Sequence, residues 1–193
     1  MKVGVLGLQG DVREHLHALT EADATAVVVK TLEQLDSVDA LVMPGGESTT
    51  IGKLLDRYGF TDALKERVAD GMPLYGTCAG AILMATDITG PQDAPHRLSV
   101  MDIGVRRNAY GRQLDSFEAD LAVEGMAEPF RAVFIRAPVI ERVGDAVEVL
   151  ATVDGDPVLV RQGPLMASTF HPEMTPDARV HSMFVKLIQE GNG

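Results

Sequence analysis

Short apolar runs and amphipathic segments alternate along the first half of the chain. The run Val3–Leu8 is continuously apolar rather than alternating. This predicts a strand covered on both faces, as in a parallel sheet. Further apolar runs at 26–29, 40–43 and 72–75 predict three more strands. Apolar residues recur at helical spacing between the strands, so the order favours a doubly wound α/β sheet with right-handed crossovers.

The first of these helices is expected to begin after Asp11. Asp11 is a good N-cap residue, and Glu14 lies three positions on, where a capping-box partner would stand. Two more helices are expected between the third and fourth strands, from apolar positions at 51–58 and 64–68.

The second half of the chain has more strands and fewer helices. Period-two alternation and apolar runs predict strands at 99–106, 116–123, 131–136, 147–153, 157–162 and 165–169. Turn signals separate them, among them Gly111 and Asp154-Gly155, and the latter predicts a hairpin. We expect some of these strands to form a smaller antiparallel or mixed patch beside the main sheet. A last amphipathic helix follows from about Val180.

Composition narrows the function classes. The chain has 193 residues with an ordinary globular composition, which fits a single domain spanning 1–193. Its net charge of −11 argues against a nucleic-acid-binding protein. A single cysteine excludes an internal disulfide, and neither a signal peptide nor a membrane-spanning run is apparent. We therefore expect a cytoplasmic protein with no membrane association.

That single cysteine, Cys78, is the first candidate for chemistry. It stands in the run Gly76-Thr-Cys-Ala-Gly80, between a predicted strand and a predicted helix. Flanking glycines suit a sharp nucleophile elbow, where a helix N-terminus stabilises a thiolate. A lone cysteine among small residues can equally be a small buried apolar side chain.

A base for Cys78 is expected at His171-Pro172-Glu173, which follows the last predicted strand. Proline favours an extended backbone at the residue before it. Residues two apart in an extended segment point the same way, so Glu173 could orient His171 as in a catalytic triad. A histidine at a strand end can also make only a local hydrogen bond. The other histidines gave weaker indications: His15 and His17 are placed far from strand ends, His96 in a loop, and His181 in packing or on the surface.

A glycine turn and two arginine segments complete the candidates. In Pro44-Gly-Gly-Glu-Ser48, backbone N–H groups could stabilise an oxyanion, Ser48 could cap the next helix and Glu47 could accept from a substrate ammonium. The same segment also fits a simple capped strand-to-helix turn. Arg107 and Arg136 end predicted strands, where an arginine lies on the surface or binds a carboxylate.

Taken together, these motifs resemble the triad-type (class I) glutamine amidotransferases: the glycine turn, the cysteine elbow, then His-x-Glu near the C-terminus. Longer runs are similar to the glutaminase subunits of pyridoxal 5′-phosphate synthase, and the likeness covers nearly the whole chain. They are Gly7-Leu-Gln-Gly-Asp-Val-Arg-Glu-His15, Arg107-Asn-Ala-Tyr-Gly-Arg-Gln-Leu-Asp-Ser-Phe-Glu118, Phe134-Ile-Arg-Ala-Pro138 and His171-Pro-Glu-Met-Thr-Pro-Asp177.

The resemblance implies a flavodoxin-like sheet and hydrolysis of L-glutamine to glutamate and ammonia through a glutamyl thioester. It implies Cys78, His171 and Glu173 as the triad, Gly46 and Ala79 as oxyanion donors, and a set of glutamine contacts at Gly46, Glu47, Ser48, Arg107, Ile135 and Arg136. It implies a (β/α)₈ synthase partner in a large hetero-oligomer, a glutaminase that is weak until docked, and no metal or cofactor.

Three other functions remain open on sequence grounds. The chain could supply ammonia to a different synthase, and only the Gly7–His15 and Arg107–Glu118 runs, which the catalytic core does not require, speak against this. A cysteine hydrolase on a similar sheet would often carry a carboxylate beside the cysteine, where this chain has Thr77 and Ala79. A non-catalytic regulatory subunit would not need an intact Cys–His–Glu set.

Overall fold

A seven-stranded, mostly parallel sheet forms the centre of the molecule. We describe it from a computed structural model, for residues 1–90, 96–107 and 116–191. The strand order is β10-β11-β12-β4-β3-β1-β2, and all pairs are parallel except β10–β11 and β11–β12. The strands are β1 (Lys2–Leu6), β2 (Thr25–Val29), β3 (Ala40–Met43), β4 (Leu74–Thr77), β10 (Glu148–Val153), β11 (Asp156–Gln162) and β12 (Leu165–Ser168). The expected doubly wound α/β sheet is confirmed.

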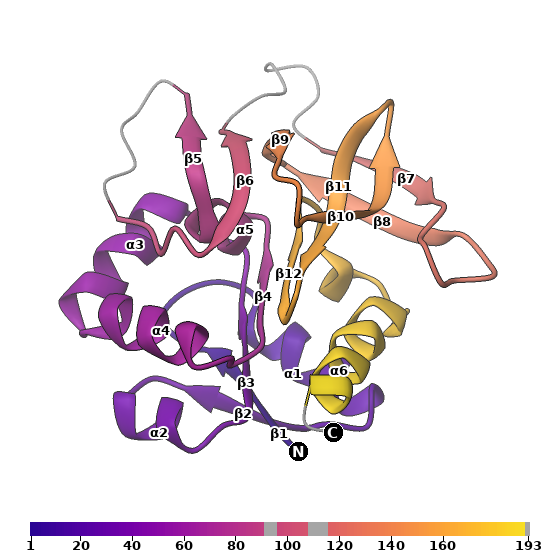
Figure 1. The fold of residues 1–193 in the computed structure, drawn as a ribbon. Coiled ribbons are helices and arrows are strands. Elements are labelled where there is room, and N and C mark those ends of the chain that lie inside the picture. The colour runs from indigo at the N-terminus through magenta and orange to yellow at the C-terminus, as the bar shows by residue number, and fades with distance from the viewer. Residues whose placement is uncertain (91–95, 108–115, 192–193) are drawn as a thin grey trace.

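Helices cover both faces of this sheet (Figure 1). One face packs against α1 (Val12–Glu21) and α6 (Arg179–Gly191), and Leu19 and Phe184 are fully buried there. The other face packs against α2 (Leu32–Asp36), α3 (Ser48–Arg57), α4 (Phe60–Ala69) and α5 (Ala79–Met84). Strands between two apolar layers must be apolar on both sides, which explains the continuous apolar runs. No helix in the described ranges is long and apolar enough to cross a membrane.

Two small sheets flank the main one on the side where the parallel strands end (Figure 1). One contains β5 (Ala85–Thr89), β6 (Met101–Arg106) and β9 (Val139–Val143), and the other pairs β7 (Ser116–Leu121) with β8 (Phe130–Ile135). The prediction of a smaller antiparallel or mixed patch beside the main sheet is therefore confirmed. The sequence did not indicate β5 or β9, and β10, β11 and β12 extend the main sheet.

The predicted turn at Asp154-Gly155 joins β10 to β11 as an antiparallel hairpin. Both residues have positive φ, 52° and 93°, which the favoured two-residue hairpin turns require. The predicted turn at Gly111 lies outside the described residues.

The carboxyl ends of four parallel strands meet at one edge of the main sheet. The segments after β1, β3, β4 and β12 carry Asp11, Gly45, Cys78 and His171 respectively. In open α/β sheets, ligands bind outside this edge. The fold therefore brings the candidate residues from distant parts of the chain to one place.

Candidate active site

Cys78 stands at a sharp turn between β4 and α5. Its backbone has φ 49° and ψ −100°, a conformation that L-residues rarely adopt and that is found at functional sites. The Cys78 N–H donates to the carbonyl of Ser168 in β12 at 2.8 Å, which holds the turn against the neighbouring strand. Gly80 allows α5 to approach β3, because a Cβ there would overlap the carbonyl oxygen of Met43. The local structure is the expected elbow.

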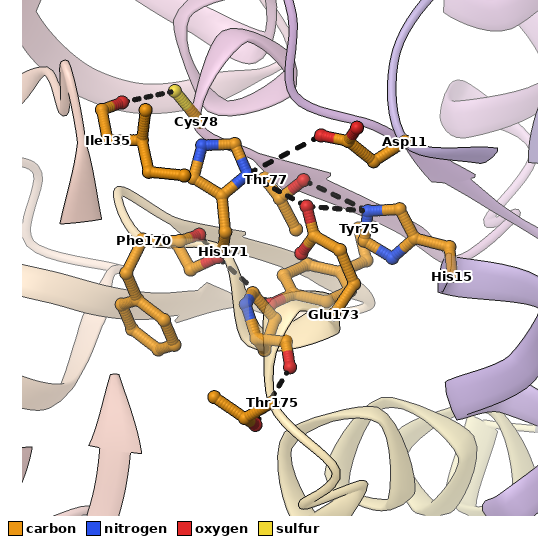
Figure 2. Close-up of polar contacts among 12 residues, drawn as sticks. Asp11, His15, Tyr75, Thr77, Cys78, Ile135, Phe170, His171, Glu173 and Thr175 are labelled. Carbon is orange, nitrogen blue, oxygen red and sulfur yellow. Dashed lines mark hydrogen bonds and ion pairs between the residues drawn. The ribbon is translucent and has the colours of Figure 1, made fainter. Parts of the chain in front are cut away.

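The thiol of Cys78 lies beside the candidate base, His171 (Figure 2). Nδ1 of His171 is 2.8 Å from Oε1 of Glu173, so the predicted contact between these side chains is present. The predicted extended backbone is wrong, since Pro172–Met174 forms a 3₁₀ turn. Both side chains are buried. Sγ of Cys78 also lies 3.9 Å from the carbonyl oxygen of Ile135.

Opposing effects act on the pKa of His171. Burial would lower this pKa, but hydrogen bonds with Cys78 and Glu173, and the negative charges of both, raise it to about 10. The imidazolium is therefore stable at neutral pH when the thiol beside it is ionised. A thiolate paired with an imidazolium is the reactive form of a catalytic cysteine.

The expected capping role of Asp11 is wrong. Asp11 occupies the N-cap position of α1, but its side chain accepts no capping hydrogen bond. Its carboxylate instead lies 4.0 Å from Nδ1 of His171. Ligand atoms of Asp11, His171 and Glu173 lie within 4.8 Å of one another, a spacing that a cation could use. Because Nδ1 of His171 already bonds to Glu173, the arrangement is that of an oriented base.

The glycine turn after β3 packs directly on His171. A Cβ on Gly45 would overlap the imidazole, so only glycine allows this approach. Gly46 has φ 146°, and the next residue, Glu47, donates its N–H to Oε1 of Gln9 at 3.1 Å. The turn is thus held by the segment that follows β1. Ala79, the other expected oxyanion donor, is the first residue of α5.

Glu47, rather than Ser48, caps α3, so the expected role of Ser48 as the cap is wrong. The Glu47 carboxylate accepts from the N–H groups of Thr49 and Thr50 at 2.9 and 2.8 Å. Burial would raise the pKa of Glu47, but these bonds and one from the Thr50 hydroxyl outweigh it and lower the pKa to about 2. Ser48 is buried in the first turn of the helix.

Arg107 follows β6 and joins this cluster. Its Nη2 donates to Oγ1 of Thr49 at 3.1 Å and lies 3.7 Å from Oε1 of Glu47. Its Nη1 is buried and has no hydrogen-bond partner among the described residues. Glu47 and Arg107 thus present a carboxylate and a guanidinium side by side. Residues 108–115 of the run Arg107–Glu118 lie outside the described residues.

Ile135 is the last residue of β8, its carbonyl oxygen faces the thiol, and Arg136 follows it. Ile135 is half-buried and Arg136 is exposed. Arg136 has φ 47°, a second unfavourable backbone conformation close to Cys78. Such conformations persist only where surrounding structure enforces them, and this one directly follows the Ile135 carbonyl that faces the thiol.

Comparison with known proteins agrees with this geometry. Residues 5–190 match the model of the SNO glutamine amidotransferase family. The chain belongs to this family. It is 56% identical to pyridoxal 5′-phosphate synthase subunit PdxT of Frankia casuarinae, over 100% of this chain and 98% of the relative. It is 55% identical to the protein of that name from Mycobacterium sp. (strain KMS), over 97% and 93%.

Solved structures give the same result. A crystal structure of a glutamine amidotransferase that is 53% identical matches with a TM-score of 0.91, over 97% of this chain and 98% of that one. The structure of PurLQS from Thermotoga maritima, 15% identical, matches with a TM-score of 0.65 over 98% and 96%, which concerns the fold alone. The doubly wound amidotransferase fold is therefore that of this chain.

Two buried histidines of this family member were not expected at the site. His15 and His181, on α1 and α6, are both fully buried. Nε2 of His15 lies 3.3 Å from Oγ1 of Thr77 and 3.5 Å from Oε1 of Glu173, behind the candidate triad. The helical pattern around each histidine gives no sign that the helix lies near the strand ends that form the site. Periodicity alone therefore could not place His15 and His181 there. For His15, the sequence feature that could have indicated this position is the Gly7–His15 run, which supplies Gln9, Asp11 and His15 to the site.

Proposed function

We propose that this chain is the glutaminase subunit of a pyridoxal 5′-phosphate synthase, hydrolysing L-glutamine to glutamate and ammonia. The observation that carries the proposal is the placement of Cys78, at a strained elbow, beside the His171–Glu173 pair. Membership of a glutamine amidotransferase family supplies the substrate. The names of its full-length relatives supply the pathway.

In the proposed reaction the Cys78 thiolate attacks the side-chain amide carbon of glutamine. The resulting oxyanion is held by the backbone N–H groups of Ala79 and Gly46, one at a helix N-terminus and one in the glycine turn. His171, which has taken the thiol proton, gives a proton to the departing ammonia. A glutamyl thioester on Cys78 remains.

Water then completes the cycle. His171, now neutral, removes a proton from a water molecule as that water attacks the thioester carbonyl, and glutamate leaves as the thiolate re-forms. Glu173 accepts from Nδ1 of His171 and so keeps Nε2 for proton transfer. The chemistry needs no metal or cofactor.

The zwitterionic end of glutamine needs both a cation and an anion. Arg107, whose buried Nη1 has no partner among the described residues, is suited to bind the substrate carboxylate. Glu47, with a pKa of about 2, stays ionised and can accept from the substrate ammonium. We assign Gly46, Ser48, Ile135 and Arg136 to the remaining contacts, as neighbours of these groups.

The ammonia passes to a synthase subunit that makes pyridoxal 5′-phosphate. We propose that this partner is a (β/α)₈ barrel, that the two subunits form a large hetero-oligomer, and that the complex works in the cytoplasm. Ammonia is released into water unless the site is covered, so docking of the partner serves both activation and transfer.

Glutamate release from the chain, with and without a pyridoxal phosphate synthase subunit, tests this function. The wild-type chain should release glutamate in the presence of the partner, and Cys78→Ala should release none while keeping its melting temperature. A glutamine-analogue affinity label should modify Cys78, the only thiol in the chain. Normal glutamate release by Cys78→Ala would overturn the assignment. Ammonia release without pyridoxal phosphate formation would leave a glutaminase that serves another synthase.

A further inference from the structure

A buried chain of polar side chains continues beyond Glu173. Oε1 of Glu173 faces Nδ1 of His171 at 2.8 Å and Nε2 of His15 at 3.5 Å (Figure 2). The other ring nitrogen of His15, Nδ1, lies 3.0 Å from Nε2 of His181. The order is therefore Cys78, His171, Glu173, His15, His181, running from the nucleophile through α1 to α6.

The orientation of the Glu173 carboxylate depends on few contacts. Its Oε2 is buried and has no hydrogen-bond partner in the described part of the chain. In the described part of the chain, Oε1 makes the polar contacts of the carboxylate: a hydrogen bond with Nδ1 of His171 and a 3.5 Å approach by Nε2 of His15. Without His15, His171 would be the one described residue with a polar contact to this carboxylate.

The tautomers of the two outer histidines follow from their surroundings. If Nε2 of His15 carried no proton, its lone pair would face the Glu173 carboxylate, and His181 would hold a proton on Nδ1. That Nδ1 is buried with no partner among the described residues, so a proton there would be an unpaired buried donor. The reverse arrangement keeps the Nε2 lone pair away from the carboxylate and leaves Nδ1 of His181 as a bare acceptor in place of an unpaired N–H donor. His181 then donates from Nε2 to His15, and His15 donates from Nε2 to Oγ1 of Thr77, with Oε1 of Glu173 3.5 Å from the same nitrogen.

From this arrangement we infer that His15 is a positioning residue of the glutaminase, held by His181 as the Nε2–H tautomer and holding Glu173 in place for His171. Both outer histidines are neutral, because burial lowers the pKa of His15 well below its usual range and that of His181 to about 4. His15 is therefore a fixed neutral donor, not a group that relays protons. This inference rests on the proposed function, since the triad is what His15 would serve.

The first test reads the tautomer directly in the wild-type protein. With ¹⁵N-labelled histidine, the side-chain resonances of His15 should show a proton on Nε2 and none on Nδ1 at every pH from 6 to 9. A proton on Nδ1, or titration of His15 within that range, would overturn the inference. The measurement does not involve glutamine, so it stands apart from the glutaminase activity.

The second test compares two variants of His15 in the complex with the synthase subunit. His15→Leu removes the donor, and kcat for glutamate release should fall about 10- to 100-fold with little change in KM, because the base is displaced while the substrate site is intact. His15→Gln places an amide N–H near the position of Nε2 and should recover most of kcat. His17→Gln, on the exposed side of the same helix, should match the wild type.

The pH profile separates positioning from simple loss of stability. The groups facing His171 and Glu173 are Asp11, Cys78, Tyr75 and His15. With His15→Leu, Glu173 turns from His171, and the basic limb of kcat/KM should move to lower pH by about one unit. Rates are expressed per Cys78 labelled by the glutamine analogue, which counts folded sites. Wild-type kcat and an unmoved profile in His15→Leu would refute the inference. An inactive wild type would instead refute the proposed function.

Discussion

Gly10, after β1, is in contact with the backbone of Gly45, after β3, so closely that a Cβ at residue 10 would overlap the Gly45 carbonyl oxygen. The first segment of the chain therefore sets the position of the glycine turn that we propose holds the oxyanion. Gly10→Ala should shift this turn and reduce kcat about 100-fold, the usual cost of losing one oxyanion donor. Steady-state glutamate release would measure the loss.

The matched control for that substitution is Gly71→Ala. Gly71 also has positive φ, 94°, but a Cβ there would meet nothing within 4 Å. It carries the same backbone penalty without the contact, so its kcat should equal that of the wild type. An equal loss of kcat in both variants would show that backbone strain, not the Gly10–Gly45 contact, is responsible.

Removing the charge of Glu173 should lower the pKa of His171. The pair raises this pKa to about 10, so the proton on His171 is stable below that pH and is lost as the pH rises through it. In Glu173→Gln the basic limb of kcat/KM should move toward pH 7, and activity at pH 8 should fall about 10- to 100-fold. His171→Asn should lose more than any change at Glu173.

Glu14→Gln provides the control for charge, because Glu14 lies on α1 beside His15 and pairs with Arg13. It should leave the profile unchanged. A basic limb in Glu173→Gln identical to that of the wild type would contradict the assigned role of Glu173.

The two buried neutral histidines predict loss of stability in mild acid. Both have pKa values below 6.5 in the folded state, so below pH 6.5 the unfolded chain binds more protons than the folded one and folding weakens as pH falls. His171, whose pKa is raised, contributes little slope well below pH 6.5 and a small opposite slope as the pH approaches 7. At pH 5, His181, with a pKa of about 4, should lower the free energy of unfolding by about 2 kcal/mol relative to pH 7, and His15 should lower it further.

Urea unfolding at pH 7 and pH 5 would measure this difference. His181→Gln removes one titrating group and should lose less stability than the wild type between the two pH values. The exposed His17→Gln should behave as the wild type. If His181→Gln lost as much as the wild type, the acid sensitivity would come from carboxylates elsewhere.

Arg107 should act on substrate affinity. A charged hydrogen bond contributes ~1.5–3 kcal/mol, so Arg107→Ala should raise KM for glutamine about 10- to 100-fold with a smaller effect on kcat. Arg131→Ala, which breaks exposed pairs with Glu118 and Asp120, should leave KM unchanged. A loss in kcat alone would place Arg107 at the reacting amide and not at the carboxylate.

Much of the architecture could be predicted because the strands of a parallel sheet are marked by continuous apolar runs. β5 was missed because the apolar residues of α5 run into it directly at Ala85, without a turn residue. β9 was missed because Val139–Val143 contains two charged residues in the middle of five. Local pattern could not show that β10, β11 and β12 join the main sheet, since that pairing connects residues far apart in sequence.

The site was predictable where a motif carries its own geometry. The elbow at Cys78 and the contact of His171 with Glu173 both follow from short segments. The Asp11 and Ser48 caps were wrong because tertiary neighbours redirect Asp11 toward His171, and because Glu47 has a longer side chain that reaches the helix N–H groups. His15 and His181 could not be placed, because their role depends on two helices that meet only in the folded state.

The bond from the Cys78 N–H to Ser168 has a mechanical consequence. Ser168 ends β12, and the same segment leads two residues later to Phe170 and then to His171. The proposed nucleophile and base therefore share one anchor. A displacement of the outer hairpin of β10 and β11 should accordingly move both groups together. Substitutions in that hairpin should therefore leave the distance between Cys78 and His171 unchanged. A one-residue shift in register between β4 and β12, in contrast, would separate the two residues.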